Sequence, residues 1–377
     1  MGPGPLNIHP RVYQALTSPV IGHLDPAYLK VLDQIGDLLR MVFRTKNRIT
    51  NAAPGTGTAG MESCVANIIE PGDPVLVCVQ GYFGDRIRQM AERQEAKLTV
   101  IEGEWGKPVD PETLEKELKK NSYKVIGLVH AETSTGVLQP MAEIAGLAKE
   151  HGAMILLDTV TSLGGVDVRI DDWGVDAAYS CSQKCIGCAA GLSPVSFSER
   201  AVESVRRRKH PVRSWYLDIS LLDKYWGTER VYHHTSSSTL NYGLLEALRL
   251  IEEEGLEKRI QRHTLNHKAL VAGVEAMGLE MLVSPEFRLP SLNTVKIPAG
   301  IDDVKVRSYL LDTYNLEIGG GLGVLKGKVW RVGLMGYSSS AENILFFIAA
   351  ISQALALQGY KTDVAAGLSA VTKALDK

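Results

Sequence analysis

The sequence predicts an α/β protein: a large domain with a mostly parallel sheet covered by helices on both faces, plus a smaller C-terminal α+β domain. Between residues 50 and 200, short apolar runs alternate with amphipathic stretches, which is the pattern of a parallel sheet buried between helices. After residue 290 strands and helices follow one another in an order typical of a small α+β domain. A chain of 377 residues is long enough for both.

Five apolar runs in the first half of the chain predict the strands of the large domain, at 74–79, 98–101, 125–130, 154–158 and 177–180. Amphipathic stretches at 111–120 and 141–151 predict two of the helices that cover the sheet. Ligands of such sheets lie beyond the carboxyl ends of the strands. The loops that follow these strands are therefore the expected place for chemistry.

A long helical stretch over about residues 240–277 leads out of the large domain. Beyond it the pattern predicts strands at 292–297, 317–318 and 328–333, and helices at 304–314 and from residue 341 onward. We place an N-terminal arm at residues 1–20, the large domain at 21–254 and the small domain at 255–377.

Composition and charge argue against several classes of function. The formal net charge is −2, so no overall field attracts nucleic acid or an anionic membrane. The first residues lack the pattern of a signal peptide, and no apolar run is long enough to cross a bilayer. Five cysteines are an odd number that suits free thiols in a reducing compartment, so we expect a cytoplasmic protein.

Two charged residues stand at the ends of neighbouring predicted strands. Four apolar residues lead directly to Asp158, and the next strand ends in small polar residues and Lys184. Lys184 is the sole charged residue between Asp176 and Glu199, whereas a surface lysine normally has polar neighbours. Desolvation favours the neutral, nucleophilic amine that Schiff-base chemistry requires, and a nearby carboxylate can keep a pyridine ring nitrogen protonated.

A glycine-rich turn, Pro54-Gly-Thr-Gly-Thr-Ala-Gly60, opens a predicted helix. Backbone N–H groups at such a helix N-terminus can bind an anion. The turn has neither the lysine of a Walker loop nor the dinucleotide-binding spacing, and no lysine or arginine stands beside it. Alone it fits an ordinary tight turn equally well. Together with Lys184 and Asp158 it becomes a candidate phosphate site.

A metal site is a weaker interpretation of the cysteines at 181, 185 and 188. Three thiols cluster without a suitably spaced fourth ligand, and Lys184 lies among them. The adjacent His233 and His234 point in opposite directions in an extended chain, so they do not ligate one ion. We therefore expect no metal.

Several ordered motifs resemble the alanine–glyoxylate and serine–pyruvate aminotransferases, which are class V members of the fold-type I pyridoxal-phosphate (PLP) enzymes. They are Ser182-Gln-Lys184, the strand end at Asp158, His130-Ala-Glu-Thr-Ser-Thr-Gly136, Tyr232-His-His-Thr235, Gly319-Gly-Gly-Leu-Gly323 and Lys328-Val-Trp-Arg331. The resemblance runs almost from end to end, and it includes the opening Gly2-Pro-Gly-Pro5.

The resemblance implies a role for each matching residue. Lys184 would carry PLP as a Schiff base, and Asp158 would pair with the ring nitrogen. The other cofactor-binding residues would be Thr56, Gly57, Thr58 and Gln183 at the phosphate, Thr133 at the phenolic oxygen, and Phe83 stacked on the ring where relatives often have Trp.

The resemblance also implies substrate contacts and a partner. Arg331 would bind the substrate carboxylate, and Gly4 would lie close to the substrate. The family is dimeric, so Tyr232 and Thr235 would reach the phosphate bound by the neighbouring subunit. We expect a homodimer with shared active sites.

The function expected from these residues is transfer of an amino group, through pyridoxamine phosphate, from alanine or serine to a short 2-oxo acid. Glyoxylate as the acceptor is implied by the resemblance alone. Two alternatives stay open: a class V lyase of the cysteine desulfurase kind, and a non-catalytic protein on the same fold. The first needs a nucleophilic cysteine late in the chain, where none follows Cys188. The second would not need Lys184, Asp158 and Arg331 together.

Overall fold

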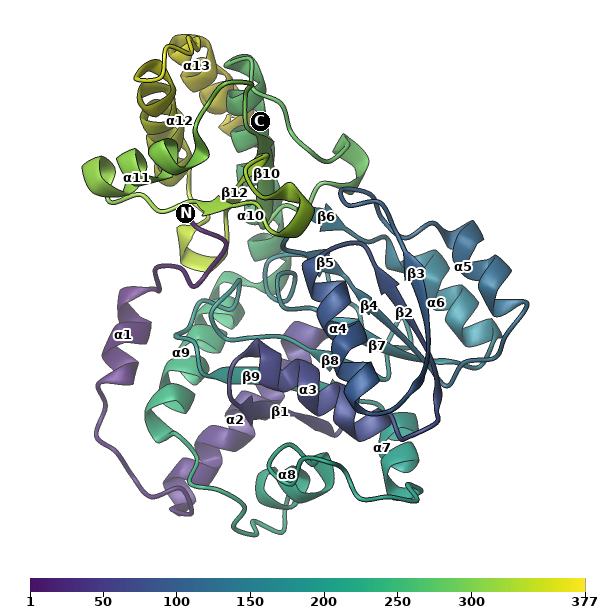
Figure 1. The fold of residues 1–377 in the computed structure, drawn as a ribbon. Helices are drawn as coiled ribbons and strands as arrows, with labels where there is room; N and C mark the ends of the chain where they lie inside the picture. Colours follow the sequence, from purple (N-terminus) through teal and green to yellow (C-terminus); the bar gives the residue numbers. More distant parts are fainter. Residues whose placement is uncertain (377) are drawn as a thin grey trace.

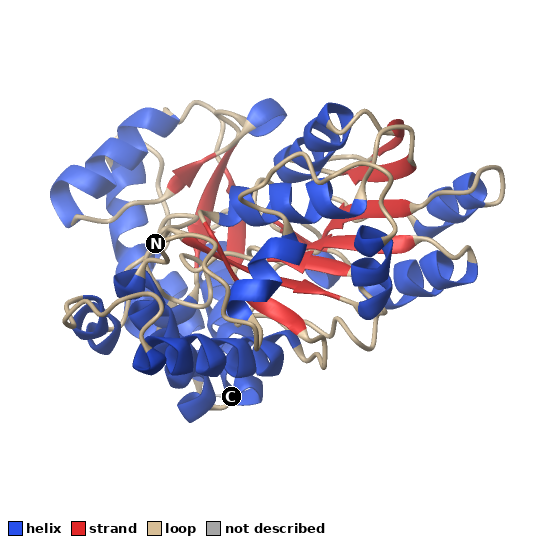
Figure 2. Cartoon of the chain, turned by 90° about the horizontal axis from the view of Figure 1, so that it is seen from below, coloured by secondary structure: helices blue, strands red, loops and turns tan. Residues whose placement is uncertain are grey.

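A seven-stranded sheet lies at the centre of the large body, with the strand order β1-β9-β8-β7-β4-β2-β3. The computed structural model describes residues 1–376 and is drawn in Figures 1 and 2. β9 is antiparallel to both of its neighbours, whereas the other adjoining pairs are parallel. The strands are β1 (Ile49–Pro54), β2 (Pro74–Val79), β3 (Lys97–Glu102), β4 (Val125–Val129), β7 (Met154–Asp158), β8 (Ala177–Tyr179) and β9 (Leu192–Phe197).

Helices cover both faces of this sheet, and the alternation of side chains along each strand supplies both apolar interfaces. In β2, for example, Leu76 belongs to one buried cluster, and Val75 and Val77 belong to the other. The first cluster includes side chains of α2 (Pro26–Phe43), α5 (Pro111–Leu118), α6 (Met141–Glu150) and α9 (Ser238–Glu254). The second includes side chains of α3 (Gly57–Ile68), α4 (Tyr82–Arg93) and α7 (Glu199–Arg206).

Shorter elements complete the large body. A two-stranded hairpin forms from β5 (Ala131–Glu132) and β6 (Val137–Leu138) just after β4. The short helices are α1 (Pro10–Leu16) and α8 (Ile219–Trp226). Among the described helices, none is both long enough and apolar enough to cross a membrane.

The smaller unit has its own sheet and its own core, at the top of Figure 1. Its antiparallel strands follow the order β10-β12-β11, with β10 (Leu292–Lys296), β11 (Gly319–Gly320) and β12 (Val329–Gly333). Its helices are α10 (Leu256–Ala276), α11 (Asp303–Tyr314), α12 (Ala341–Ala356) and α13 (Val364–Leu375), and its 3-10 turns are Pro285–Phe287, Gly323–Leu325 and Gly336–Ser338. The α/β class with a mostly parallel sheet is confirmed.

The prediction of a single long helix after the large domain was wrong. The stretch at 240–277 is two helices, because Gly255 ends α9 and precedes α10 with a φ of 81°. This backbone conformation suits glycine and interrupts the helical path. The break coincides with the boundary expected at residues 254–255, and the division into domains at that point stays a prediction.

The first residues of the chain lie against the smaller unit. The Gly333 N–H at the end of β12 donates to the Met1 carbonyl over 2.8 Å. A Cβ atom added to Gly333 would lie 2.1 Å from the Gly2 carbonyl oxygen, so only a glycine fits there. From this point the chain leads down to α1, which packs against α9.

Candidate active site

Asp158 lies at the carboxyl end of β7, in the middle of the large sheet. Its side chain is buried; Oδ1 accepts a hydrogen bond from the Val160 N–H at 2.8 Å, and Oδ2 accepts one from the Tyr179 hydroxyl at 2.6 Å. Burial raises the pKa of Asp158 to about 7, although both hydrogen bonds favour the charged form. A cationic ligand next to Asp158 would therefore stabilise the charged form of its carboxylate.

Tyr179 is a site residue that the sequence analysis missed. It ends β8, directly beside Asp158 in the parallel pairing of β7 with β8. The two strand ends could have shown it, because residues that end neighbouring parallel strands meet at one edge of the sheet.

Lys184 follows β8 at the same edge. Burial lowers the pKa of its amine, and among residues 1–376 no carboxylate forms an ion pair with it. Its Nζ donates instead to the Pro3 carbonyl. A Cβ atom on Gly4 would lie 2.8 Å from Lys184 Cδ and 3.0 Å from Nζ, so the opening residues rest directly on the lysine.

The glycine-rich turn lies beside this lysine. Thr56 caps α3 without a side-chain hydrogen bond, and the N–H groups of Gly57 and Thr58 stand in the first turn, where helices have no internal acceptors. A Cβ atom on Gly57 would lie 2.9 Å from the Cys181 Cβ. The helix N-terminus therefore packs closely against the chain that leads into Lys184.

A cation does stand beside this turn, contrary to the impression given by the sequence. Arg86, in the first two turns of α4, donates from Nη1 to the Thr58 hydroxyl at 3.3 Å. Its guanidinium carbon also lies 5.0 Å from the centre of the Phe83 ring and 5.2 Å from that of Tyr82. The fold brings this charge to the turn from a helix almost thirty residues away, so local sequence could not reveal it.

Thr133 lies on the hairpin after β4 and joins two parts of the site. Its hydroxyl is hydrogen-bonded to that of Thr161, in the loop after Asp158, and its carbonyl accepts a hydrogen bond from Arg331. The neighbouring Glu132 is buried and accepts hydrogen bonds from the Phe83 N–H at 3.2 Å and from the Ser134 hydroxyl at 2.6 Å. Burial raises the pKa of Glu132.

Arg331 extends from the central strand of the smaller sheet toward the large body. Its Nε donates to the Gly320 carbonyl at 2.8 Å, and its Nη1 donates to the Thr133 carbonyl at 3.3 Å. Burial lowers the pKa of the guanidinium, and in the described chain no carboxylate forms an ion pair with it. A buried cation without an anion is a suitable receptor for a carboxylate ligand.

Gln183 carries a further unmatched polar group. Its Oε1 atom is buried and has no hydrogen-bond partner among residues 1–376. Buried amide oxygens are usually paired. Its position next to Lys184 therefore leaves a polar group available to a ligand.

Two residues expected at the site are not brought to it within one chain. Tyr232 is 57% exposed, and its ring lies 5.1 Å from that of His23; Thr235 is also exposed. They follow α8, which in Figure 1 lies at the far side of the large body from the N-terminus. Their expected role requires a second subunit and stays a prediction.

The cysteines are poor nucleophiles in this structure. All five are free and buried, and burial raises the pKa of Cys181 to about 12 and that of Cys185 to about 11. Among the residues that the structure describes, no three potential ligands gather to hold a metal ion.

The chain is similar to several known proteins over most of its length. A family model described as aminotransferase class V matches residues 54–344. The alanine–glyoxylate aminotransferase of Drosophila melanogaster is 40% identical, with 97% of this chain and 94% of that protein covered. Two crystal structures are very similar: ureidoglycine–glyoxylate aminotransferase from Bacillus subtilis (TM-score 0.98, 38% identity, 100% and 97% covered) and alanine–glyoxylate aminotransferase from Nostoc sp. (TM-score 0.93, 51% identity, 94% of each covered).

Proposed function

Since the chain belongs to the class V aminotransferases, which use PLP, we propose that it moves an amino group from alanine or serine to glyoxylate at the site around Lys184 and Asp158. The environment of Lys184 is the observation that best supports this position for the site. A desolvated amine without a carboxylate partner lies among the ends of β7 and β8, the N-terminus of α3 and the Arg331 strand.

The residues present fit PLP. Asp158 is a buried carboxylate that forms no ion pair among residues 1–376, and burial raises its pKa; a protonated pyridine nitrogen would supply a cation for it. The N-terminus of α3 supplies N–H groups and a positive dipole end for a phosphate, and Arg86 adds a charge beside it. The Gln183 amide lies next to Lys184, and its nitrogen, rather than the unpaired Oε1 acceptor, is the group that suits an anionic phosphate. We assign Thr56, Gly57, Thr58 and Gln183 to the phosphate, Thr133 to the phenolic oxygen and Phe83 to the ring face.

When bound, PLP supplies an aldehyde carbon and a protonated ring that accepts the electron pair released at the substrate Cα. Three side chains would then act on the substrate or the cofactor: Lys184, Asp158 and, as described below, Arg331. The Lys184 amine, whose pKa is lowered by burial, would take the proton from the substrate Cα as general base. Asp158 would hold the ring nitrogen in its protonated form through its negative charge.

Arg331 orients the substrate. Two of its nitrogens are held by backbone carbonyls, so the guanidinium is fixed before a substrate carboxylate arrives. The opening residues cover Lys184, with Gly4 in contact with its side chain and the Pro3 carbonyl bound by its amine. This cover limits the space at Cα and favours a small amino donor, and it excludes water from the proton transfer.

The choice of substrates rests on the named relatives and on this restricted space. Relatives named for alanine–glyoxylate transfer and for ureidoglycine–glyoxylate transfer share glyoxylate, which supports glyoxylate as the acceptor here. Alanine or serine as the donor is the narrower part of the proposal.

We extend the proposal to the assembly and its location. A homodimer would bring Tyr232 and Thr235 of one subunit to the phosphate site of the other; their exposure in the single chain supports this arrangement. Five free thiols support a cytoplasmic location.

The decisive experiment combines absorbance with trapping. The purified protein should be yellow, borohydride should fix a phosphopyridoxyl group on Lys184, and Lys184→Ala should lose transamination. Alanine, serine and larger amino acids would then be compared as donors, with glyoxylate and pyruvate as acceptors. A protein that stays colourless with added PLP would contradict the site, whereas turnover with large donors only would contradict the proposed substrate.

A further inference from the structure

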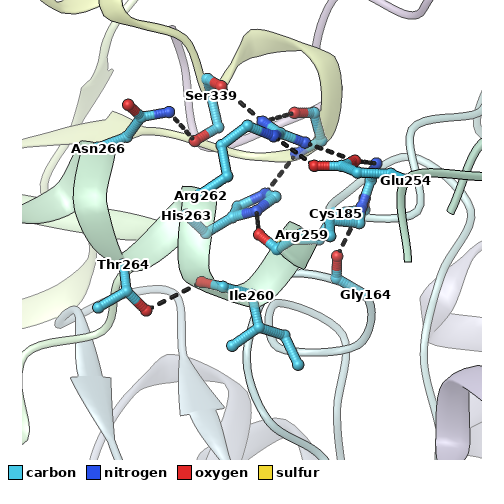
Figure 3. Close-up of polar contacts among 11 residues, drawn as sticks. Gly164, Cys185, Glu254, Arg259, Ile260, Arg262, His263, Thr264, Asn266 and Ser339 are labelled. Atoms are coloured by element: carbon cyan, nitrogen blue, oxygen red, sulfur yellow. Dashed lines mark hydrogen bonds and ion pairs between the residues drawn. The ribbon is translucent and has the colours of Figure 1, made fainter. Parts of the chain in front are cut away.

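Arg259, at the start of α10, is a buried cation that the proposed chemistry does not use. Its side chain is 7% exposed and forms an ion pair of 2.8 Å with the Glu254 carboxylate. Its Nε donates to the Gly164 carbonyl at 2.9 Å, and its Nη2 donates to the Cys185 carbonyl at 2.8 Å (Figure 3). Desolvating a guanidinium is costly unless its donors are paired, so these three acceptors are held in a fixed arrangement around it.

The two carbonyls belong to the two segments that carry the charged site residues. Cys185 directly follows Lys184, and Gly164 lies in the loop that begins after Asp158. The segments also touch each other: a Cβ atom on Gly165 would lie 2.6 Å from the Cys185 sulfur. Because the guanidinium is planar and rigid, its fork sets the separation of the two carbonyls.

The next residues of α10 extend this connection to the strand of Arg331. The His263 Nε2 accepts a hydrogen bond from the Gly336 N–H at 2.9 Å, so Nδ1 carries the proton and donates to the Arg259 carbonyl at 2.8 Å. Arg262 donates to the Ser339 carbonyl at 2.6 Å and pairs with Glu254. In Figure 3 the side chains of Glu254, Arg259, Arg262 and His263 lie close together, and Gly336 begins the turn that follows β12.

We infer that Arg259 is a positioning residue, which fixes the Cys185 carbonyl, one residue after Lys184, against the loop after Asp158 and so directs the Lys184 amine. The inference rests on the proposed role of Lys184. Without the bond to the Cys185 carbonyl, the lysine backbone can shift while Arg331 still binds the substrate. A misplacement of about 1 Å can cost roughly a hundredfold in rate. We therefore expect a loss in kcat and a much smaller change in KM.

The test compares Arg259→Gln and Arg259→Lys with Arg262→Gln. The lysine variant keeps the charge beside Glu254, but one ammonium cannot reproduce the fork to both carbonyls. Arg262 shares the Glu254 carboxylate but contacts neither Gly164 nor Cys185, so Arg262→Gln is the matched control for damage to the network. Four quantities are measured: kcat, KM, the pH midpoint of the cofactor absorbance, and amide hydrogen exchange at residues 185–188 in the apo protein.

We expect both Arg259 variants to lose kcat by tenfold or more, to shift the absorbance midpoint, and to exchange faster at the Gly187 and Cys188 amides, which donate to the carbonyls of Lys184 and Ser182. Arg262→Gln should be less stable but should keep the absorbance midpoint. Folded Arg259 variants with wild-type kcat and midpoint would overturn the inference. If the variants do not fold, exchange at 185–188 in wild type as fast as in an exposed loop would overturn it. A colourless wild-type protein would instead refute the proposed function, because the exchange measurement needs no cofactor.

Discussion

Asp158 and Tyr179 together form the charged end of the site that would face a ring nitrogen. In Asp158→Asn the shape and the hydrogen-bonding positions remain, but the negative charge is lost. Removing such a preorganised charge costs roughly 3–4 kcal/mol, so kcat should fall by about a hundredfold or more while PLP still binds. Single-turnover kinetics with alanine, followed by the absorbance of the cofactor, would measure this.

Tyr179→Phe is the matched variant for that experiment. It removes one neutral donor but keeps the carboxylate charge, so its loss should be smaller, on the order of tenfold for one hydrogen bond. Equal turnover in wild type and Asp158→Asn would show that the carboxylate has only a structural role.

At the scale of elements, the N-terminus of α3 and the first turns of α4 together would form the proposed phosphate end of the site. Arg86→Gln removes the charge beside Thr58, and hydrogen bonds to charged groups contribute about 1.5–3 kcal/mol. The Kd for PLP should therefore rise about tenfold or more. Equilibrium dialysis of PLP measures this change.

Arg88→Gln is the control, because Arg88 lies on the same helix and pairs only with Asp85 and Glu92 in the described chain. A similar loss of affinity in both variants would mean that α4 itself was disturbed. An unchanged affinity in Arg86→Gln would remove Arg86 from the phosphate site.

Helix α10 makes the stability of the protein depend on pH. Burial and the nearby Arg259 and Arg262 hold the pKa of His263 at about 3, with Glu254 acting in the opposite sense. Because this pKa lies below the ordinary value of about 6.5, the neutral ring stabilises the fold above pH 6.5. That contribution is lost as the pH falls toward 3, by up to about 1.4 kcal/mol per pH unit.

Urea unfolding at pH 7.5, 6 and 5 would reveal this slope. In His263→Asn one titrating group is gone, so its free energy of unfolding should fall less steeply than that of the wild type below pH 6.5. Parallel slopes in the two proteins would show that His263 protonates as readily in the folded state as in the unfolded one.

At the scale of the whole molecule, the exposed Tyr232 and Thr235 predict that each active site is built from two chains. Inactive Lys184→Ala subunits can be mixed with inactive Tyr232→Ala/Thr235→Ala subunits, unfolded, and refolded together. A mixed dimer would have one site with both defects and one site with neither, so activity should recover. Proven heterodimers as inactive as their parents would refute the shared site.

The sequence predicted what depends on local pattern. Strands β2 and β7 stand at the expected residues because each is a continuous apolar run, and the polar residue that ends β7 pointed to the site. It did not predict β1 and β9, since β9 contains Pro194 and pairs with a segment far away in the chain. Arg86 and Arg259 were missed for a similar reason: tertiary structure alone brings their guanidinium groups to the site.

The antiparallel strand β9 has a consequence for how the protein is made. In the large sheet β1 pairs only with β9, with Ile49 opposite Phe197. Because β9 is the last strand of this sheet along the chain, β1 has no partner strand until most of the large body has been synthesised. Contacts between such distant segments carry a large loop-closure entropy and slow folding. Lys184 lies just before β9, and we therefore expect this lysine to take up its place in the same late step that closes the sheet. A nascent chain that ends before β9 would leave the backbone N–H and C=O groups of β1 unpaired, and such an open edge favours aggregation.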